Sequence, residues 1–245
     1  MNDKLQQIDT LLGELNQYRA NENYRITEAL EIEYTYDSNR IEGNTLTLHE
    51  TDMVVNKGIT IAGKGLREHL EAINHKEAID FIKDVAQKKE PISERVLLDI
   101  HAIVLHSIDK DNAGKYRRVP VIISGSKHIP PQPYLLQPKM DELFQWYEAN
   151  KDSMHPVVLA AKMHEKLVSV HPFIDGNGRT ARLLMNLILM QHGYPIANIK
   201  GDNETRRRYY ETLEEASSGD NSAFLEFIED VVIQSLTYYL KIIRG

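Results

Sequence analysis

A helix that is apolar on nearly every side directly follows a polar, glycine-rich segment, and this junction most constrains the fold. The run LLMNLILMQHG, at residues 183–193, has almost no polar face. Such a helix is normally buried, because no side of it suits water. The segment before it, HPFIDGNGRTAR at residues 171–182, brings a histidine, an aspartate, an asparagine and two arginines together. We therefore expect a polar cluster inside the protein, at the N-terminus of a buried helix.

This polar cluster has the composition of an anion-binding site. The first N–H groups of a helix lack partners within it and carry the positive end of its dipole, so phosphate binds there readily. Gly176 and Gly178 allow a tight turn and the close approach of a ligand. Because Arg179 and Arg182 are three residues apart, they lie on one helix face and can converge on the same ligand.

Two further residues indicate transfer chemistry on a polyphosphate. Asp175 suits phosphate only if Mg²⁺ lies between them, and Mg²⁺ typically binds one or two carboxylates together with substrate phosphates. His171 is suited to proton transfer near neutral pH. Each residue alone also fits an ordinary turn or a surface charge. The whole set at this spacing favours a functional site.

The segment HPFIDGNGRTAR resembles the signature of the Fic family, His-Pro-Phe-x-Asp/Glu-Gly-Asn-Gly-Arg-x-x-Arg, and every specified position matches. The resemblance implies an all-α, Fic-like helical bundle and transfer of AMP from ATP to a Ser, Thr or Tyr hydroxyl of a protein. It implies His171 as general base, Phe173 as the buried anchor of the loop and Asp175 as the Mg²⁺ ligand. The implied phosphate contacts are Gly176, Asn177, Gly178, Arg179 and Arg182.

A second match lies upstream, in SNRIEG at residues 38–43. It resembles the inhibitory motif of the family, Ser/Thr-x-x-x-Glu-Gly/Asn, with Ser38, Glu42 and Gly43 at the specified positions. The resemblance implies that Glu42 pairs with Arg182. An Arg–carboxylate pair shielded from water is strong. The γ-phosphate would therefore lose its contact with Arg182, and ATP would bind in an unproductive position. The same residues also fit a plain helix end capped by Gly43.

Residues 119–131, VPVIISGSKHIPP, carry the clearest β signal of the chain. Two β-branched arms flank Gly125 and Ser126, and prolines end the segment, which predicts a small β-hairpin. An exposed strand edge can pair with an extended peptide. The resemblance implies a flap here on which the protein substrate docks, and a hairpin without a binding role is the alternative.

Tyr209 and Tyr210, in RRRYYETL, resemble aromatic residues of the nucleoside pocket in the family. Aromatic rings stack well on adenine, and amphipathic core packing explains the two tyrosines equally well. Where some family members have an adenine-contacting asparagine, this chain has Ser217. The base of the nucleotide is therefore left open.

Composition limits the partners, the chemistry and the cellular location that we expect for this protein. The net charge is −7, whereas nucleic-acid-binding proteins usually carry a basic stripe, so we expect no nucleic-acid partner. The chain has no cysteine, which excludes disulfides, a thiolate nucleophile and zinc–thiolate sites. The N-terminus lacks an apolar signal core and no apolar run reaches about 18 residues. We therefore expect a cytoplasmic protein without a membrane partner.

Apolar residues recur at helical spacing along most of the chain. We expect a helical region with the inhibitory motif at residues 1–90, a catalytic core at 91–221, and a C-terminal helix packed on the core at 222–245. Helical spacing predicts helices over residues 3–18, 25–40, 47–56, 66–88, 93–106, 140–148, 157–170, 204–217 and 222–243.

The sequence thus predicts a protein adenylyltransferase that uses ATP and Mg²⁺ and is held in check by Glu42. Three alternatives stay open: removal of AMP, use of another nucleotide donor, and a non-catalytic nucleotide-binding regulator. The intact His171 argues against the last of these. A homodimer follows from the family analogy alone.

Overall fold

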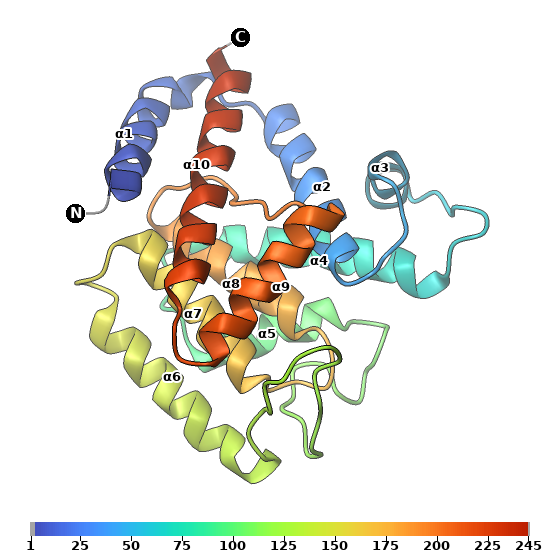
Figure 1. The fold of residues 1–245 in the computed structure, drawn as a ribbon. Coiled ribbons are helices and arrows are strands. Elements are labelled where there is room, and N and C mark those ends of the chain that lie inside the picture. The colour runs from blue at the N-terminus through green and yellow to red at the C-terminus, as the bar shows by residue number, and fades with distance from the viewer. Residues whose placement is uncertain (1–2, 245) are drawn as a thin grey trace.

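Within residues 3–244, which the computed structural model describes, every regular element is helical (Figure 1). The helices predicted from apolar spacing are all present, although the helix expected at 140–148 begins earlier. Residues 1 and 2 of the predicted N-terminal region and residue 245 of the predicted C-terminal helix lie outside the described residues. The elements are α1 (Asp3–Tyr18), η1 (Arg19–Asn21), α2 (Tyr24–Ile41), α3 (Leu48–Lys57), α4 (Leu66–Gln87), α5 (Glu94–Val104), η2 (Pro133–Leu135), α6 (Leu136–Asn150), α7 (Pro156–Val170), α8 (Asn177–Gln191), α9 (Asn203–Ser217) and α10 (Ser222–Arg244).

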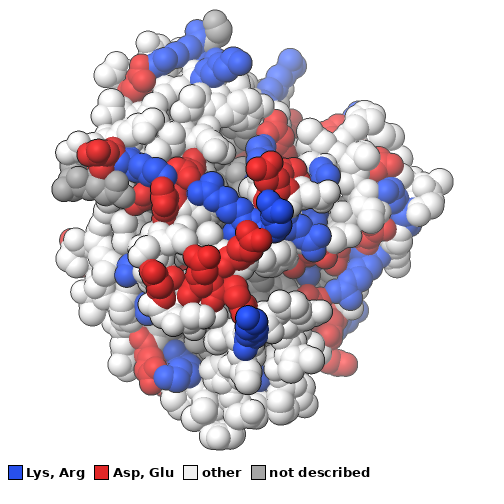
Figure 2. Space-filling model, viewed as in Figure 1, with Lys and Arg blue, Asp and Glu red and all other residues white. Residues whose placement is uncertain are grey.

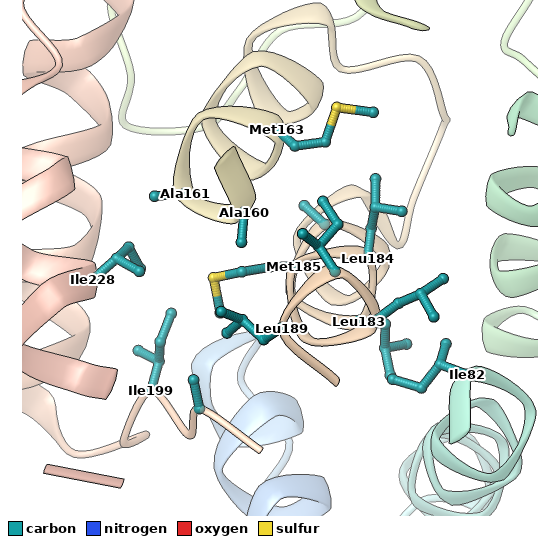
Figure 3. Packing of buried hydrophobic residues seen from close by; sticks show 14 of the residues in the cluster. Ile82, Ala160, Ala161, Met163, Leu183, Leu184, Met185, Leu189, Ile199 and Ile228 are labelled. Atoms are coloured by element: carbon teal, nitrogen blue, oxygen red, sulfur yellow. The ribbon is translucent and has the colours of Figure 1, made fainter. Parts of the chain in front are cut away.

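Helix α8 lies at the centre of the molecule, as its apolar sequence predicts. It packs between α7 and α4, with Leu183 facing Ile82 of α4 and Met185 facing Ala160 of α7 (Figure 3). Burial of each large apolar side chain contributes roughly 1.5–3 kcal/mol. Because α8 is packed on several sides, its N-terminus is fixed in position within the protein.

A single cluster of buried apolar side chains joins the three predicted parts of the chain. It includes Ile8 of α1, Leu97 of α5 and Leu236 of α10. Helix α1 packs along α10 (Figure 1), and α2 packs on α4. The N-terminal helices and the C-terminal helix therefore share the core that holds α7 and α8.

Helix α2 is placed so that its C-terminal end points at the N-terminus of α8. It begins at Asn23, whose side-chain oxygen accepts hydrogen bonds from the first backbone N–H groups of the helix, a favourable N-cap. It ends at Ile41, and Gly43 then adopts a φ of 98°, a left-handed conformation that favours glycine. This turn leaves Glu42 at the tip of the helix.

The prediction of a β-hairpin over residues 119–131 is wrong, because the segment forms no strands. This segment, which we call the flap, is described in full and contains no strand. Figure 1 draws it as a green loop without arrows. A turn is present where it was expected, because Ser126 N–H donates to the Ile123 carbonyl at 3.1 Å and Gly125 has a φ of 80°. The two arms do not pair with each other.

The physical reason lies in the prolines and in contacts outside the flap. Proline lacks the N–H that a β ladder requires, and three flap positions are proline: Pro120, Pro130 and Pro131. The Arg117 guanidinium instead donates to the carbonyls of Val119 and Pro131, at 3.0 and 2.6 Å. β-Branched residues favour extended backbone without specifying its partner. The arms are therefore held by Arg117, which lies outside the flap, and not by each other.

No helix among residues 3–244 is both long and apolar enough to cross a membrane. On the face shown in Figure 2, acidic and basic side chains lie beside one another. This mixed surface agrees with the modest net charge of −7.

Candidate active site

The polar segment forms the loop between α7 and α8, and we call residues 171–176 the motif loop. His171 ends α7 with a φ of 48°, and its N–H donates to the Leu167 carbonyl at 3.0 Å. Gly176 precedes α8 with a φ of 77°. A left-handed backbone costs a non-glycine residue roughly 1–2 kcal/mol, so the surrounding structure must hold His171 in place.

Asn177 fixes the motif loop with its side chain. Its Oδ1 accepts from the Phe173 N–H at 3.0 Å, and its Nδ2 donates to the Phe173 carbonyl at 2.9 Å. The Phe173 ring is fully buried, as expected for the loop anchor. The Asn177 side chain is therefore committed to the loop, and its backbone N–H, at the start of α8, is the group that remains for an anion.

His101 of α5 packs against the motif loop and holds it in place. Its ring stacks on Phe173 with a centroid distance of 3.6 Å. Nδ1 accepts from the Gly114 N–H at 3.0 Å, so the ring proton is on Nε2, which donates to the Asp175 carbonyl at 3.0 Å. Burial, together with nearby Arg179, lowers the pKa of His101 to about 4. The ring is thus neutral and has a defined tautomer.

Arg117 connects the motif loop to the flap. It is almost fully buried. Its Nε donates to the His171 carbonyl at 2.9 Å, and its backbone N–H donates to the Pro172 carbonyl at 2.9 Å. The same guanidinium holds both ends of the flap, as described above. Arg117 therefore fixes the positions of the flap and of His171 relative to each other.

The two glycines of the motif are required for different reasons. A Cβ on Gly176 would lie 3.3 Å from Cγ1 of Val104, and its backbone is left-handed. A Cβ on Gly178 would collide with Oε1 of Glu42 and lie 3.0 Å from Nη1 of Arg182. The first turn of α8 is thus open at Gly178, and the Glu42 carboxylate occupies this space.

Arg182 is held by the end of α2. Its Nη2 donates to the Glu42 carboxylate at 2.7 Å and to the Ser38 carbonyl at 2.9 Å, and its Nε donates to the Ser38 hydroxyl at 3.0 Å. The arginine is 1% exposed, whereas the Glu42 side chain is 31% exposed. Burial alone would lower the pKa of Arg182, but the Glu42 carboxylate raises it above its ordinary value. Arg182 is therefore a permanent cation that faces a carboxylate.

Arg179 belongs to a closed ring of four charges. It lies 3.3 Å from the Asp175 carboxylate and 3.4 Å from that of Glu71. Arg67, which is exposed, contacts the same two carboxylates from the opposite side. Burial opposes ionisation of Asp175, but Arg179, the Gly176 N–H and Arg67 together hold its pKa below the ordinary value. Asp175 is ionised at neutral pH.

The described residues contain no cluster of three or more histidine, aspartate or glutamate side chains that would bind a metal by itself. Asp175 provides one ionised carboxylate beside the N-terminus of α8. This donor set fits Mg²⁺ that is shared with a phosphate ligand, since Mg²⁺ rarely depends on an all-protein cage.

His171 is suited to accept a proton. Burial and the nearby Arg117 lower the pKa of His171 to about 4, so the imidazole is neutral at pH 7. Its Nδ1 makes no hydrogen bond of good geometry, although the Val168 carbonyl lies nearby. A neutral imidazole can accept a proton, although a pKa of about 4 makes it a weak base in the absence of ligands.

The structure separates the two tyrosines. Tyr209 is buried; Arg182 donates to its hydroxyl at 3.4 Å, and the hydroxyl lies 3.0 Å from Nε2 of His164. Tyr210 is 43% exposed and donates to the Ile41 carbonyl at 3.2 Å, with Arg206 over its ring. Only Tyr210 presents a face that a nucleobase could reach.

Several residues of the site carry no local signal in the sequence. His101, Arg117, Arg67 and Glu71 reach the motif loop or its arginines from distant positions in the chain. Arg117 lies in the segment AGKYRR, which resembles a Gly-x-Tyr-Arg segment of the family but from which the sequence alone assigns no chemistry. Only the spatial arrangement identifies these side chains as parts of the site.

Within the described residues, fold and site together define an all-helical protein in which a glycine-rich loop leads into a buried helix, and Arg182 of this helix is held by a carboxylate from the N-terminal region. Residues 91–189 match the model of the Fic/DOC family. Among solved structures, Fic-1 from C. elegans is 32% identical and superimposes with a TM-score of 0.86 over 97% of this chain and 71% of that chain. The chain therefore belongs to the Fic/DOC family.

Other relatives agree with this assignment. A Fic domain-containing signaling protein from Bacteroides thetaiotaomicron is 28% identical, with a TM-score of 0.88 over 99% of this chain and 97% of that chain. Protein adenylyltransferase Fic of Nematostella vectensis is 39% identical over 210 residues, which cover 85% of this chain and 48% of that protein. The corresponding protein of Culex quinquefasciatus is 40% identical over 211 residues, which cover 85% of this chain and 41% of that protein. The chain thus spans about half the length of these curated relatives, or less.

Proposed function

We propose that this protein transfers AMP from ATP to a Ser, Thr or Tyr hydroxyl of a target protein. The observation that carries the proposal is the N-terminus of α8, where no side chain caps the first backbone N–H groups and the Arg182 guanidinium borders the space beside Gly178. Arg179, on the same turn, contacts Asp175. Curated relatives at about 40% identity are named protein adenylyltransferases, which supports the same activity here. An anion with several phosphates matches these donors.

In the proposed reaction, each residue of the motif loop and of α8 has a defined role. His171 accepts the proton of the target hydroxyl, and the hydroxyl oxygen attacks the α-phosphorus of ATP. The bond from the α-phosphorus to the bridging oxygen breaks, and pyrophosphate leaves. The α8 N–H groups and the two arginines stabilise the negative charge that develops on the phosphate oxygens. The AMP remains on the target oxygen as a phosphodiester.

Asp175 is the residue that would hold Mg²⁺. When bound, Mg²⁺ neutralises phosphate charge and supports the leaving pyrophosphate. Arg67 now contacts one oxygen of this carboxylate, and the Gly176 N–H donates to the other at 2.6 Å. These two contacts fix the orientation of the Asp175 carboxylate.

Glu42 is proposed to inhibit the enzyme. Its carboxylate occupies Arg182 and fills the open space beside Gly178. A γ-phosphate needs the same guanidinium, and two anions cannot share it at close range without repulsion. Binding of ATP in a productive position therefore requires that Glu42 moves away.

The flap is proposed as the docking segment for the target. The side chains of Val119, Ile122 and Ile129 are 52%, 91% and 78% exposed. The backbone N–H groups of residues 121–123 have no partner in the described chain, so they can form backbone hydrogen bonds with an extended target segment. Tyr210 is proposed to stack on the nucleobase. A homodimer and a cytoplasmic location stay predictions from the sequence.

Labelled ATP distinguishes AMP transfer from its alternatives. The Glu42→Gly variant is incubated with Mg²⁺, cell lysate and ATP that carries ³²P at either the α or the γ position. We expect protein-bound label from α-labelled ATP only, with none in the His171→Ala variant or in EDTA. Label from the γ position alone, or equal labelling by the His171→Ala variant, would contradict the proposal.

A further inference from the structure

Glu214 of α9 holds the tip of the flap. Its carboxylate accepts a hydrogen bond from the Ser126 hydroxyl and another from the Lys127 N–H, the latter at 2.8 Å. The Ser126 hydroxyl also accepts from the His128 N–H at 3.0 Å. Hydrogen bonds to an ionised acceptor are about twice as strong as neutral ones. These bonds lower the pKa of Glu214, the Ser126 hydroxyl most of all.

The far arm of the flap has a second anchor, on α7. The His128 ring nitrogen Nε2 lies 2.7 Å from the Ser169 carbonyl, two residues before the proposed base. Residues 126–128 are therefore attached to α9 and α7, while Arg117 attaches the base of the flap. Between these anchors, the backbone N–H groups of residues 121–123 have no partner in the described chain. The anchors leave this arm free for pairing.

Glu214 also lies on a helix face that reaches the other parts of the site. It is one turn after Tyr210, so both side chains lie on the same face of α9. The Tyr210 hydroxyl donates to the Ile41 carbonyl, directly before Glu42. One rigid helix face thus contacts both the end of α2 and the tip of the flap.

We propose that Glu214 is a positioning residue for the protein substrate: by holding Ser126 and Lys127, it fixes the position in which residues 121–123 present their free backbone N–H groups to an extended target segment. The inference rests on the proposed function of the flap. It explains how an arm that does not pair with its neighbour keeps one conformation. Ordering the arm in advance spares the target part of the entropy cost of docking.

Hydrogen exchange tests the contact itself, without any need for catalysis. Glu214→Ala, prepared in the Glu42→Gly background, removes both acceptors from a half-buried helix position, where alanine favours the helix. We expect the Lys127 and His128 amides to exchange about tenfold faster, as loss of a hydrogen bond to a charged group worth about 1.5 kcal/mol implies. The matched control is Glu215→Ala, since Glu215 is the exposed neighbour on the same helix. Unchanged exchange in Glu214→Ala would overturn the proposal.

Kinetics then test the positioning role. AMP incorporation from α-labelled ATP is measured while the concentration of lysate protein or of ATP is varied. We expect Glu214→Ala to raise the half-saturating lysate concentration about threefold to tenfold and to leave the half-saturating ATP concentration within twofold. Glu214→Gln keeps one oxygen acceptor, so its half-saturating lysate concentration should lie between that of Glu214→Ala and that of the parent with Glu214. An equal shift for lysate protein and ATP, or the same shift in Glu215→Ala, would refute a role in target positioning.

Failure of the proposed function would give a different result. If the Glu42→Gly parent transfers no AMP at all, the adenylyltransferase proposal is wrong and the positioning role is overturned with it. The exchange rates of the Lys127 and His128 amides would still show whether Glu214 holds the flap tip. Active parent enzyme with unchanged kinetics in Glu214→Ala would overturn the positioning role alone.

Discussion

Replacing Glu42 with glycine should raise the rate of AMP transfer, because it frees Arg182 for the γ-phosphate. The change removes one acceptor, at 2.7 Å from Nη2, and leaves two others on Ser38, at 2.9 and 3.0 Å. The guanidinium should therefore stay in place and keep its orientation. The freed Nη2 would face the open space at Gly178.

The size of the effect follows from the contact that is lost. A hydrogen bond to a charged group contributes about 1.5–3 kcal/mol, and each 1.4 kcal/mol corresponds to a factor of ten in rate. The expected gain at low ATP is therefore about 10- to 100-fold. Since the Glu42 side chain is 31% exposed, water screens the pair and the lower half of this range is expected.

The same change should reduce stability. Arg182 is 1% exposed and would lose its only carboxylate contact among the described residues. A loss of about 1–3 kcal/mol is expected, which for a chain of this size lowers Tm by about 3–10 °C. The variant should therefore be both more active and less stable, as expected when a stabilising contact opposes function.

Initial rates of incorporation from α-labelled ATP, measured beside thermal melts, provide the assay. Glu42→Gln keeps the shape but loses the charge, so its rate should lie between those of Glu42 and Glu42→Gly. Glu28→Gln is the matched control, because Glu28 is exposed on the same helix and far from Arg182 in sequence. A lowered Tm without any gain in rate would show that the pair is structural only, and would refute the reasoning.

Three further outcomes are expected. Burial lowers the pKa of His101 to about 4 from 6.5, so the unfolded chain binds a proton in this pH window that the folded protein does not. The contribution of His101 to stability should be full above pH 6.5 and fall by about 3 kcal/mol at pH 4; buried His164 and His171, whose pKa values are lowered too, act in the same direction. A Tm that is constant from pH 7 to 4.5 would contradict this. Asn177→Ala leaves the buried Phe173 backbone unpaired and should cost about 1–3 kcal/mol in urea unfolding; an unchanged midpoint would argue against this role of Asn177. Arg67→Gln should strengthen Mn²⁺ binding severalfold, measured by electron paramagnetic resonance, because Arg67 competes for Asp175; weaker Mn²⁺ binding would exclude competition.

The helices could be predicted from the sequence because each buries one face. Spacing of apolar residues records this burial locally, as in α1, where Ile8 and Leu15 are fully buried. The central position of α8 was predictable for the same reason, since almost all of its side chains are apolar. Such information lies within a few helical turns of each residue.

The flap could not be predicted correctly, because its shape depends on distant partners. The β-branched arms and the turn at Gly125 predicted a hairpin. The structure instead holds the segment through Arg117, Glu214 and the Ser169 carbonyl. Nothing in residues 119–131 indicates these contacts.

Some features of the candidate site could be predicted from the sequence, and others depend on distant partners. The sequence predicted the motif loop and, through the family resemblance, a pair between Glu42 and Arg182; the structure contains this pair, and its inhibitory effect remains a proposal. Support by His101 and Arg67 was not predictable. Each reaches the loop from another helix, and a single polar residue on a helix gives no indication of its partner.

A crystal structure of the Glu42→Gly variant with a non-hydrolysable ATP analogue and Mg²⁺ tests the central claim most directly. The account predicts that the triphosphate lies along the first turn of α8, with Arg182 in contact with the γ-phosphate and Asp175 beside the metal. A triphosphate bound elsewhere, or an Arg182 that contacts only Ser38 and Tyr209 while nucleotide is bound, would contradict it.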